Sequence, residues 1–499
     1  MKQRRAIFLV LILVCALFLP SCAKQEPPLA LRAGQEGFLS EKEGAYFFSQ
    51  KQKALKLAGD FTASFLSQDE KHMVAINSKK ELVVAESGKT GDIVDREISS
   101  ILSVNNQCVY YQSALKGVRR YRFSDKKVTM VGYAKKYTLS ADYSSALILS
   151  DDLELISLCK DAPEPTVIPY EGDRSALQPL GISNDGTAVC FTAMDPSGKR
   201  AFYYSSEGEN ELLGTVDTKK LKETTLSFSP DGSELILAAE DTDFLFIREK
   251  GGEIRKIELD GKIGSTIFSD HGSLEEAFSL SPLYFTLENS KGVRSLYRLD
   301  DKGNQEKLLT DVTQWELRGD KVYYRSKAFE LSVATLKDGK VDHIDMICDE
   351  SMFFQATLDG SAVFYYSLSD SDSLFVGDLY CAQYGSAPVR LARDCNFLTL
   401  KLSTDSKHYA FSANAVVLDS MGLSTSGDLY YGKIGEAPEK IDSNAIDLFG
   451  QYENSHFFTK NFCYLKRVST DEDWAICTLN YFNGKQARQL ASDINHKIF

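Results

Sequence analysis

The sequence predicts an all-β protein assembled from one repeated unit of four strands, and three observations lead to this prediction. A short signature, Ser or Thr followed two residues later by Asp, recurs along most of the chain. Between the signatures lie runs of roughly 5–8 residues rich in Val, Ile, Leu, Phe and Tyr, which are typical of β-strands. Few stretches show the spacing of an amphipathic helix.

The signature sets the period of the repeat at about 45 residues, because clear copies are separated by that interval or its multiples. Degraded copies fill the longer intervals, and ten units result when these are included. The clear copies begin at Ser67, Ser140, Ser183, Ser229, Thr357, Ser403 and Ser469, and the degraded copies begin at Ser103, Ser279 and Arg318.

Each unit holds material for four strands. In the unit around Ser229, an apolar run precedes the signature, and Glu234–Ala239 and Phe244–Arg248 supply the next two strands. Four strands in about 45 residues form the blade of a β-propeller. The sequence therefore predicts a propeller of four-stranded antiparallel blades with about 8–10 candidate units, as a single large ring, with two rings as the alternative. The segment Phe38–Leu57 is predicted to form a strand hairpin that helps to close the ring.

The N-terminus follows a different pattern. A basic start, Met1–Arg5, precedes the fourteen apolar residues Ala6–Leu19 and then Pro20-Ser21-Cys22. This is the layout of a secretory signal peptide, and the apolar run is too short for a comfortable transmembrane helix. The predicted organisation is a signal peptide over residues 1–21, a tether over residues 22–36 and the propeller over residues 37–499.

The end of the apolar run resembles the lipobox of bacterial lipoproteins, with Leu19 three residues before Cys22 and Ser21 directly before it. The resemblance implies that Cys22 carries a thioether-linked diacylglycerol. Two acyl chains give stable anchoring where one gives only marginal binding, so the implied location is the extracytoplasmic face of a bacterial cell membrane.

The repeat itself resembles the WD40-like blades of the TolB type, whose motif centres on Ser-Pro-Asp-Gly. The best match is Ser229–Leu237, and Ser183–Phe191 comes next. The resemblance covers residues from about 60 to 499 by organisation. It implies a propeller that serves as an interaction module.

Composition argues against several functions. The chain has 57 Lys and Arg against 70 Asp and Glu, a formal net charge of -13. Residues 1–21 hold three basic residues and no acid, so the charge without them is -16. A chain this acidic is a poor ligand for nucleic acid, because such binding depends on neutralising phosphates with Lys and Arg. With 6 His and 2 Trp, there is little material for zinc sites, His-based catalysis or Trp-lined sugar platforms.

Sites for chemistry are sparse in the sequence. It contains no Gly-x-Ser-x-Gly elbow, no His-Glu-x-x-His and no glycine-rich phosphate-binding motif, so we expect no catalytic residue, no metal and no cofactor. The acidic cluster Asp342–Glu350 is interpreted as a solvated loop. Cys463 and Cys477 flank the turn at Ser469–Asp471 and are the best candidates for a disulfide in an exported protein.

Three functions remain open at this point. The first is a membrane-anchored lipoprotein whose non-catalytic propeller binds a protein, peptide or glycan through loops on a rigid ring. The alternative is an extracytoplasmic carbohydrate-active enzyme whose carboxylates converge on the central channel, and three acids within about 10 Å of one another lining that channel would favour it. The third is a sensor or assembly factor for envelope machinery.

Overall fold

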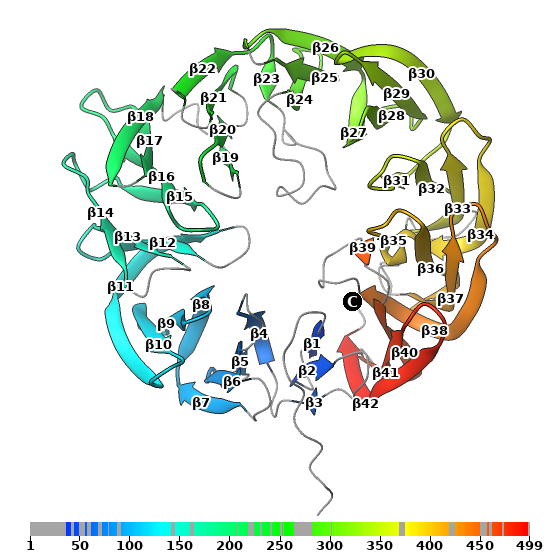
Figure 1. The fold of residues 1–499 in the computed structure, drawn as a ribbon, viewed down its shortest axis with the longest axis horizontal. Helices are drawn as coiled ribbons and strands as arrows, with labels where there is room; N and C mark the ends of the chain where they lie inside the picture. The colour runs from blue at the N-terminus through cyan, green and yellow to red at the C-terminus, as the bar shows by residue number, and fades with distance from the viewer. Residues whose placement is uncertain are drawn as a thin grey trace, which may run out of the picture.

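The computed structural model describes residues 36–497 apart from short gaps, of which the longest are 264–281 and 450–456. Within the described residues, nearly all regular structure is β-strand, together with a short 3-10 helix, η2 (Phe397–Thr399). The strands form antiparallel sheets that follow one another around a single ring (Figure 1). The fold is a β-propeller. The predicted all-β class is confirmed.

Ten four-stranded blades can be traced in the described chain. Six are separate sheets, and the seven-stranded and eight-stranded sheets each contain two blades that share one long strand. Blade 1 is β4 (Phe61–Leu66), β5 (His72–Asn77), β6 (Leu82–Glu86) and β7 (Asp92–Asp95); blade 2 is β8 (Ile98–Val104), β9 (Cys108–Ser113), β10 (Gly117–Arg122) and the first half of β11 (Lys127–Leu139); blade 3 is the second half of β11, β12 (Ala146–Ser150), β13 (Leu155–Leu158) and β14 (Thr166–Ile168); blade 4 is β15 (Gln178–Ile182), β16 (Ala188–Met194), β17 (Arg200–Ser206) and β18 (Glu209–Val216); blade 5 is β19 (Thr224–Phe228), β20 (Leu235–Ala239), β21 (Phe244–Arg248) and β22 (Ile254–Glu258).

The second half of the ring repeats this plan. Blade 6 is β23 (Lys262–Ile263), β24 (Leu283–Glu288), β25 (Arg294–Leu299) and β26 (Gln305–Thr310); blade 7 is β27 (Val312–Arg318), β28 (Lys321–Ser326), β29 (Leu331–Lys337) and β30 (Lys340–Cys348); blade 8 is β31 (Phe353–Ala356), β32 (Ala362–Leu368), β33 (Val376–Gln383) and β34 (Val389–Asn396); blade 9 is β35 (Lys401–Ser403), β36 (His408–Val417), β37 (Thr425–Lys433) and the first half of β38 (Glu439–Phe449); blade 10 is the second half of β38, β40 (Phe462–Asp471), β41 (Trp474–Phe482) and β42 (Ala487–Lys497), while β39 (Phe457–Phe458) pairs in parallel with β35.

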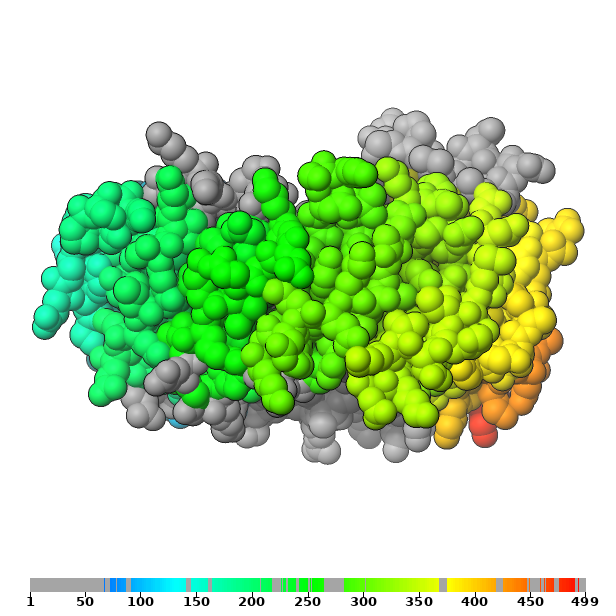
Figure 2. Space-filling model, turned by 90° about the horizontal axis from the view of Figure 1, so that it is seen from above, coloured from blue at the N-terminus to red at the C-terminus, as the bar shows by residue number. Residues whose placement is uncertain are grey.

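Within each blade the first strand lies nearest the ring axis and the fourth lies at the rim (Figure 1). Seen from its edge, the ring is a disc, and the blades follow one another around the visible rim in sequence order (Figure 2). Because successive strands are antiparallel, turns alternate between the two faces of this disc.

The hydrophobic core is divided among the junctions between blades. Nine clusters of buried residues each join two successive blades, from blades 1 and 2 to blades 9 and 10. At one of them Phe285 of blade 6 packs with Ile236 and Leu245 of blade 5. Both faces of a blade are therefore buried, which explains why the strands read as nearly continuous apolar runs.

The Ser/Thr-x-Asp signature closes the turn between the first and second strands. The Ser183 hydroxyl accepts a hydrogen bond from the Ala188 N–H at 3.0 Å and donates to the Asp185 carboxylate at 2.6 Å. The same two bonds recur at Thr357 and at Ser403. The signature Asp thus holds its own turn, as Asx-turn chemistry allows. Hydroxyls that accept the same backbone N–H bond also occur at Ser67, Ser140 and Ser229.

The last signature occupies a different turn from the one predicted. Ser469-Thr470-Asp471 ends β40 and leads into β41, the second and third strands of blade 10. Ser, Thr and Asp suit any tight turn, so the residues alone do not identify which turn of a blade they form. The degraded copy at Ser279 lies outside the described residues.

The N-terminal strands β1 (Glu36–Ser40), β2 (Gly44–Phe48) and β3 (Leu55–Lys56) form a three-stranded antiparallel sheet. In β1 and β2, Glu36 is paired with Phe48 and Ser40 with Gly44, so the predicted hairpin is confirmed. The β1 strand lies against β4 of blade 1 and β42 of blade 10, between the first and last blades (Figure 1).

Gly186 should be intolerant of a side chain for two reasons. Its φ is +76°, and an added Cβ would lie 2.6 Å from the Cys159 sulfur and 2.8 Å from the Cys159 Cα of the preceding blade. We expect Gly186→Ala to lower the free energy of unfolding by about 2–4 kcal/mol, from the left-handed backbone and overpacking together. Thermal unfolding measures this.

Gly198 provides the matched control, since its φ is +80° but an added Cβ would meet no atom within 4 Å. Gly198→Ala should therefore cost only about 1 kcal/mol, the backbone contribution alone. Equal losses in the two variants would contradict the close contact between the blades at Gly186.

Candidate functional site

One face of the disc carries two cavities within the described residues. It is formed by the turns between second and third strands and by the segments that lead from the fourth strand of one blade to the first strand of the next. We call it the crossover face. Two cavities on it are adjacent, one at blades 1 and 2 and one at blades 2 to 4.

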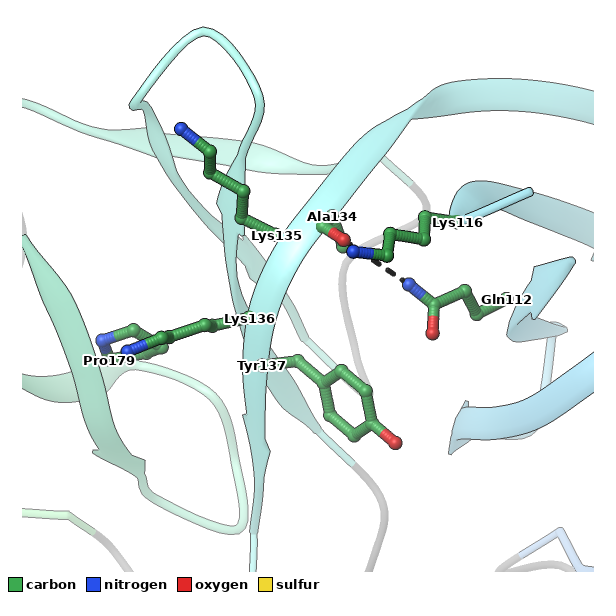
Figure 3. Close-up of a pocket in the computed structure, with 7 residues that line it drawn as sticks. All are labelled: Gln112, Lys116, Ala134, Lys135, Lys136, Tyr137 and Pro179. Atoms are coloured by element: carbon green, nitrogen blue, oxygen red, sulfur yellow. Dashed lines mark hydrogen bonds between the residues drawn. The ribbon is translucent and has the colours of Figure 1, made fainter. Parts of the chain in front are cut away.

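The cavity at blades 2 to 4 has a volume of about 350 Å³, and we call it the lysine cavity. Figure 3 shows Gln112 and Lys116 approaching from one side of β11 and Pro179 of β15 lying on the other. The Gln112 side-chain amide donates a hydrogen bond to the Ala134 carbonyl at 3.3 Å, which fixes the amide group. The cavity is lined by Gln112, Lys116, Ala134, Lys135, Lys136, Tyr137 and Pro179.

The three lysines of this cavity are not neutralised within the protein. Among the described residues, no ion pair or side-chain hydrogen bond joins the ammonium groups of Lys116, Lys135 and Lys136 to a partner. No acidic residue lines the cavity. In a chain with a net charge of -13, the lysine cavity is therefore a local concentration of positive charge.

The neighbouring cavity, of about 470 Å³, differs because acidic and basic residues are equal in number in its lining and two ion pairs form there. Arg119 lies 2.7 Å from the Asp95 carboxylate, and Arg96 lies 3.2 Å from Glu81. Burial by itself would raise the pKa of Asp95, but hydrogen bonds from Arg119 and Tyr111 outweigh it and lower the pKa. This second cavity therefore offers little uncompensated charge to a ligand.

The first strands of the blades carry few carboxylates. Across the described inner strands, from β4 to the second half of β38, the acidic residues are Glu316 and Asp447, and the side chain of Asp447 is not among those described. Glu316 is fully buried, lies 3.0 Å from Arg318 and accepts a hydrogen bond from the Ala356 N–H at 3.1 Å. It therefore joins blades 7 and 8 and does not face a ligand.

The cysteines predicted to pair are not brought together. In the β40–β41 hairpin, Cys463 is opposite Tyr481 and Cys477 is opposite Arg467, so the two are four positions apart in register. A disulfide requires Cα atoms about 4.4–6.8 Å apart, and four strand residues span about 13 Å. Cys477 is a buried free thiol. The hairpin turns between Asp471 and Trp474, further along the chain than the predicted turn at Ser469–Asp471, and the two cysteines are therefore not symmetric about it.

The other predicted site residues have different outcomes. Cys22, with the signal peptide and tether, lies outside the described residues. The acidic cluster at 342–350 lies largely on the exposed rim strand β30, where His343 is 2.7 Å from Asp345, and is not a loop. Within the described part of the chain, no three His, Cys, Asp or Glu side chains are arranged to hold a metal ion. That part also lacks a helix long and apolar enough to cross a membrane.

The lysine cavity itself was not predicted. Its residues are separated in sequence, and Lys135-Lys136 alone is indistinguishable from a solvated pair. In the structure, a β-bulge leaves Lys135 unpaired between Ala134 and Lys136 at the start of the inner strand of blade 3. The position of this bulge depends on strand register, which the sequence does not reveal.

No family model matches this sequence, and no curated protein matches it. Solved structures do match. The crystal structure of the eukaryotic initiation factor has 12% identity and a TM-score of 0.42, with 82% of this chain and 96% of that chain covered. The tricorn protease has 12% identity and a TM-score of 0.33, with 93% of this chain and 54% of that chain covered. Porphyromonas gingivalis dipeptidyl peptidase 4 has 13% identity and a TM-score of 0.38, with coverages of 84% and 64%.

The chain thus spans about half of the tricorn protease chain and somewhat less than two thirds of the peptidase chain. At these identities the likeness concerns the fold alone. The TolB-type resemblance and the lipobox are not tested by these matches and stay predictions.

Proposed function

We propose that this protein is a lipid-anchored extracytoplasmic lipoprotein whose propeller is a non-catalytic binding module. The observation that carries the proposal is the scarcity of carboxylates on the inner strands, where the one described acidic side chain, Glu316, is buried against Arg318. A glycosidase of the alternative kind needs two carboxyl groups about 5–10 Å apart that face the substrate. The crossover face, with its cavities, is the proposed ligand face, and the ligand is a protein, peptide or glycan.

The proposed anchor is Cys22, followed by a tether over residues 22–36. Pro27-Pro28 stiffens this segment. Without residues 1–21 the net charge is -16, so an anionic membrane surface repels the propeller. The tether is therefore suited to holding the ring away from the lipid.

Cys22→Ser should abolish membrane anchoring, because serine has no thiol to receive the diacylglycerol. We expect the variant either as a released protein or as an uncleaved precursor, which fractionation and intact mass distinguish. Cys15→Ser, in the apolar run, is the matched control and should remain anchored with its mass after processing unchanged. A Cys22→Ser protein with unchanged location and mass would contradict the lipoprotein assignment.

A second experiment tests whether the propeller binds a ligand without cleaving it. The purified protein is incubated with arrays of glycans and peptides, and the retained ligands are recovered and analysed by mass spectrometry. We expect at least one ligand to be retained and recovered intact. Shortened products that accumulate in proportion to protein concentration would favour the carbohydrate-active enzyme instead.

A further inference from the structure

The β-bulge that opens the inner strand recurs in several blades, and its extra residue varies from blade to blade, with Leu180 in blade 4. In blades 2 and 7 this residue is Ser99 and Thr313, and each hydroxyl donates to a main-chain carbonyl of its own blade at 3.0 Å. In blade 3 the extra residue is Lys135, between Ala134 and Lys136. Lysine cannot make this short bond and its side chain extends outward (Figure 3). Bulges re-aim side chains and are frequent next to functional sites.

Lys116 occupies a backbone position with positive φ. Its φ is +61°, in the turn closed by the bond from its N–H to the Ser113 carbonyl. The equivalent turns of blades 4 and 6 have Gly198 and Gly292 at this position, which tolerate positive φ without cost, whereas those of blades 1, 3 and 7 also have larger residues, Lys80, Leu153 and Phe329. A lysine here places its ammonium group at the cavity although glycine would be the easier residue for the backbone.

The remaining lining residues suit a sugar ring. The Tyr137 side chain is 40% exposed and presents an aromatic surface to the cavity. The Gln112 amide nitrogen is committed to Ala134, and its oxygen, turned away from that bond in Figure 3, can accept from a hydroxyl. The volume of about 350 Å³ lies within the range of small-ligand sites.

The main chain of β11 is hydrogen-bonded along one edge in each half, to β10 up to Tyr133 and to β12 from Ala134 onward. Its other edge has no paired strand among the described residues, so an acidic peptide that adds as a strand is the competing occupant and is included in the test. The aromatic surface of Tyr137 and the fixed amide of Gln112, next to three cations, favour a carbohydrate.

We propose that the lysine cavity binds an anionic glycan, with a carboxylated or sulfated sugar near Lys116, Lys135 and Lys136 and a sugar ring against Tyr137. This inference rests on the proposed binding function and specifies its ligand. No carboxylate lines the cavity, so it lacks the pair of carboxyl groups that most glycosidases use.

The test titrates the purified full-length protein by isothermal calorimetry with defined probes. These are a mannuronate trimer, a sulfated mannose trimer, neutral mannotriose, inorganic phosphate and a glutamate hexapeptide. We expect an anionic trimer to bind with a Kd below about 1 mM and mannotriose at least about tenfold more weakly. Preference between the two anionic trimers identifies carboxylate or sulfate as the recognised group. Affinity should fall as salt rises, because exposed charges are screened.

Three variants locate the site. Lys116→Gly removes one ammonium group at a backbone position that suits glycine, so binding should weaken at least about threefold with folding intact. Lys135→Gln combined with Lys136→Gln should weaken it at least about tenfold. Lys291→Gln, in the corresponding turn of blade 6, is the matched control and should leave affinity unchanged.

Several outcomes would overturn the inference: no binding of either anionic trimer, equal binding of mannotriose, tighter binding of the hexapeptide or of phosphate alone, or unchanged affinity in all lysine variants. If the arrays reveal a ligand whose binding ignores the lysine variants, the inference fails while the binding module stands. If an anionic trimer binds at the lysines and is cleaved, the site stands while the non-catalytic function fails.

Discussion

Above pH 10 the propeller should lose its stability within about one to two pH units. Among the almost completely buried tyrosines, six have a pKa that is raised, and burial is the largest cause in each case. An unfolded tyrosine has a pKa near 10. The six are Tyr110, Tyr111, Tyr323, Tyr365, Tyr366 and Tyr409.

The direction in which stability changes with pH follows from the number of protons that each state binds. Between pH 10 and the raised folded-state pKa, the unfolded chain has lost these protons and the folded chain still holds them. The free energy of unfolding therefore falls as pH rises, by about 1.4 kcal/mol per pH unit for each group. Six groups together give about 8 kcal/mol per pH unit, comparable to the whole stability of an ordinary domain. Below pH 10 the effect is absent.

Circular dichroism and tyrosinate absorbance recorded together against pH provide the measurement. We expect both to change in one cooperative step between about pH 11 and 12. Tyr366→Phe should reduce the pH slope of stability by about 1.4 kcal/mol per unit, because it removes one of the buried hydroxyls. Tyrosine ionisation that is complete near pH 10 with the fold intact would show that these hydroxyls are not shielded from solvent.

Glu316→Ala should be among the most destabilising single substitutions. It leaves the Arg318 guanidinium, itself buried, without its 3.0 Å partner, and it removes the acceptor of the Ala356 N–H. Removing one member of a buried ion pair costs about 3–5 kcal/mol, because the remaining charge is uncompensated. The urea midpoint of the purified protein should fall accordingly.

Two further variants show whether the loss of stability in Glu316→Ala comes from the unpaired buried charge. Glu316→Leu together with Arg318→Met should recover most of the stability, because no unpaired charge remains buried. Glu436→Ala breaks the exposed pair with Lys433, at 2.8 Å, and should change stability by less than about 1 kcal/mol. A Glu316→Ala loss no larger than that of Glu436→Ala would mean that water reaches the 316–318 pair.

Much of the fold was predictable because the repeat encodes it locally. The hydroxyl of Ser183 and the carboxylate of Asp185 act within one turn, so their spacing in sequence is their spacing in space. The number of units could be counted for the same reason. The predictions that failed were those that depended on which residues lie opposite each other in neighbouring strands. Cys463 and Cys477 look symmetric about Ser469–Asp471, yet the strands turn between Asp471 and Trp474, which leaves the two cysteines four positions apart.

The ligand cavity depends on register even more strongly. Lys135 extends outward because Ala134 and Lys136 pair with adjacent residues of β12, Ser150 and Leu149. A single sequence does not reveal which residue of a strand is left unpaired. Likewise, Lys116 joins Lys135 and Lys136 only through the pairing of β10 with β11, which a list of residues does not contain.

The sharing of β11 between blades 2 and 3 has a consequence for ligand affinity. Most neighbouring blades are joined by a separate connection, which can adjust its torsion angles, whereas here one strand crosses the junction with hydrogen bonds to β10 before it and β12 after it. The lysine cavity lies at this crossing. Its main chain is ordered before any ligand arrives, so little backbone entropy remains to be lost on binding. Lys135 and Lys136 thus stand on one of the two strands that the ring shares between neighbouring blades.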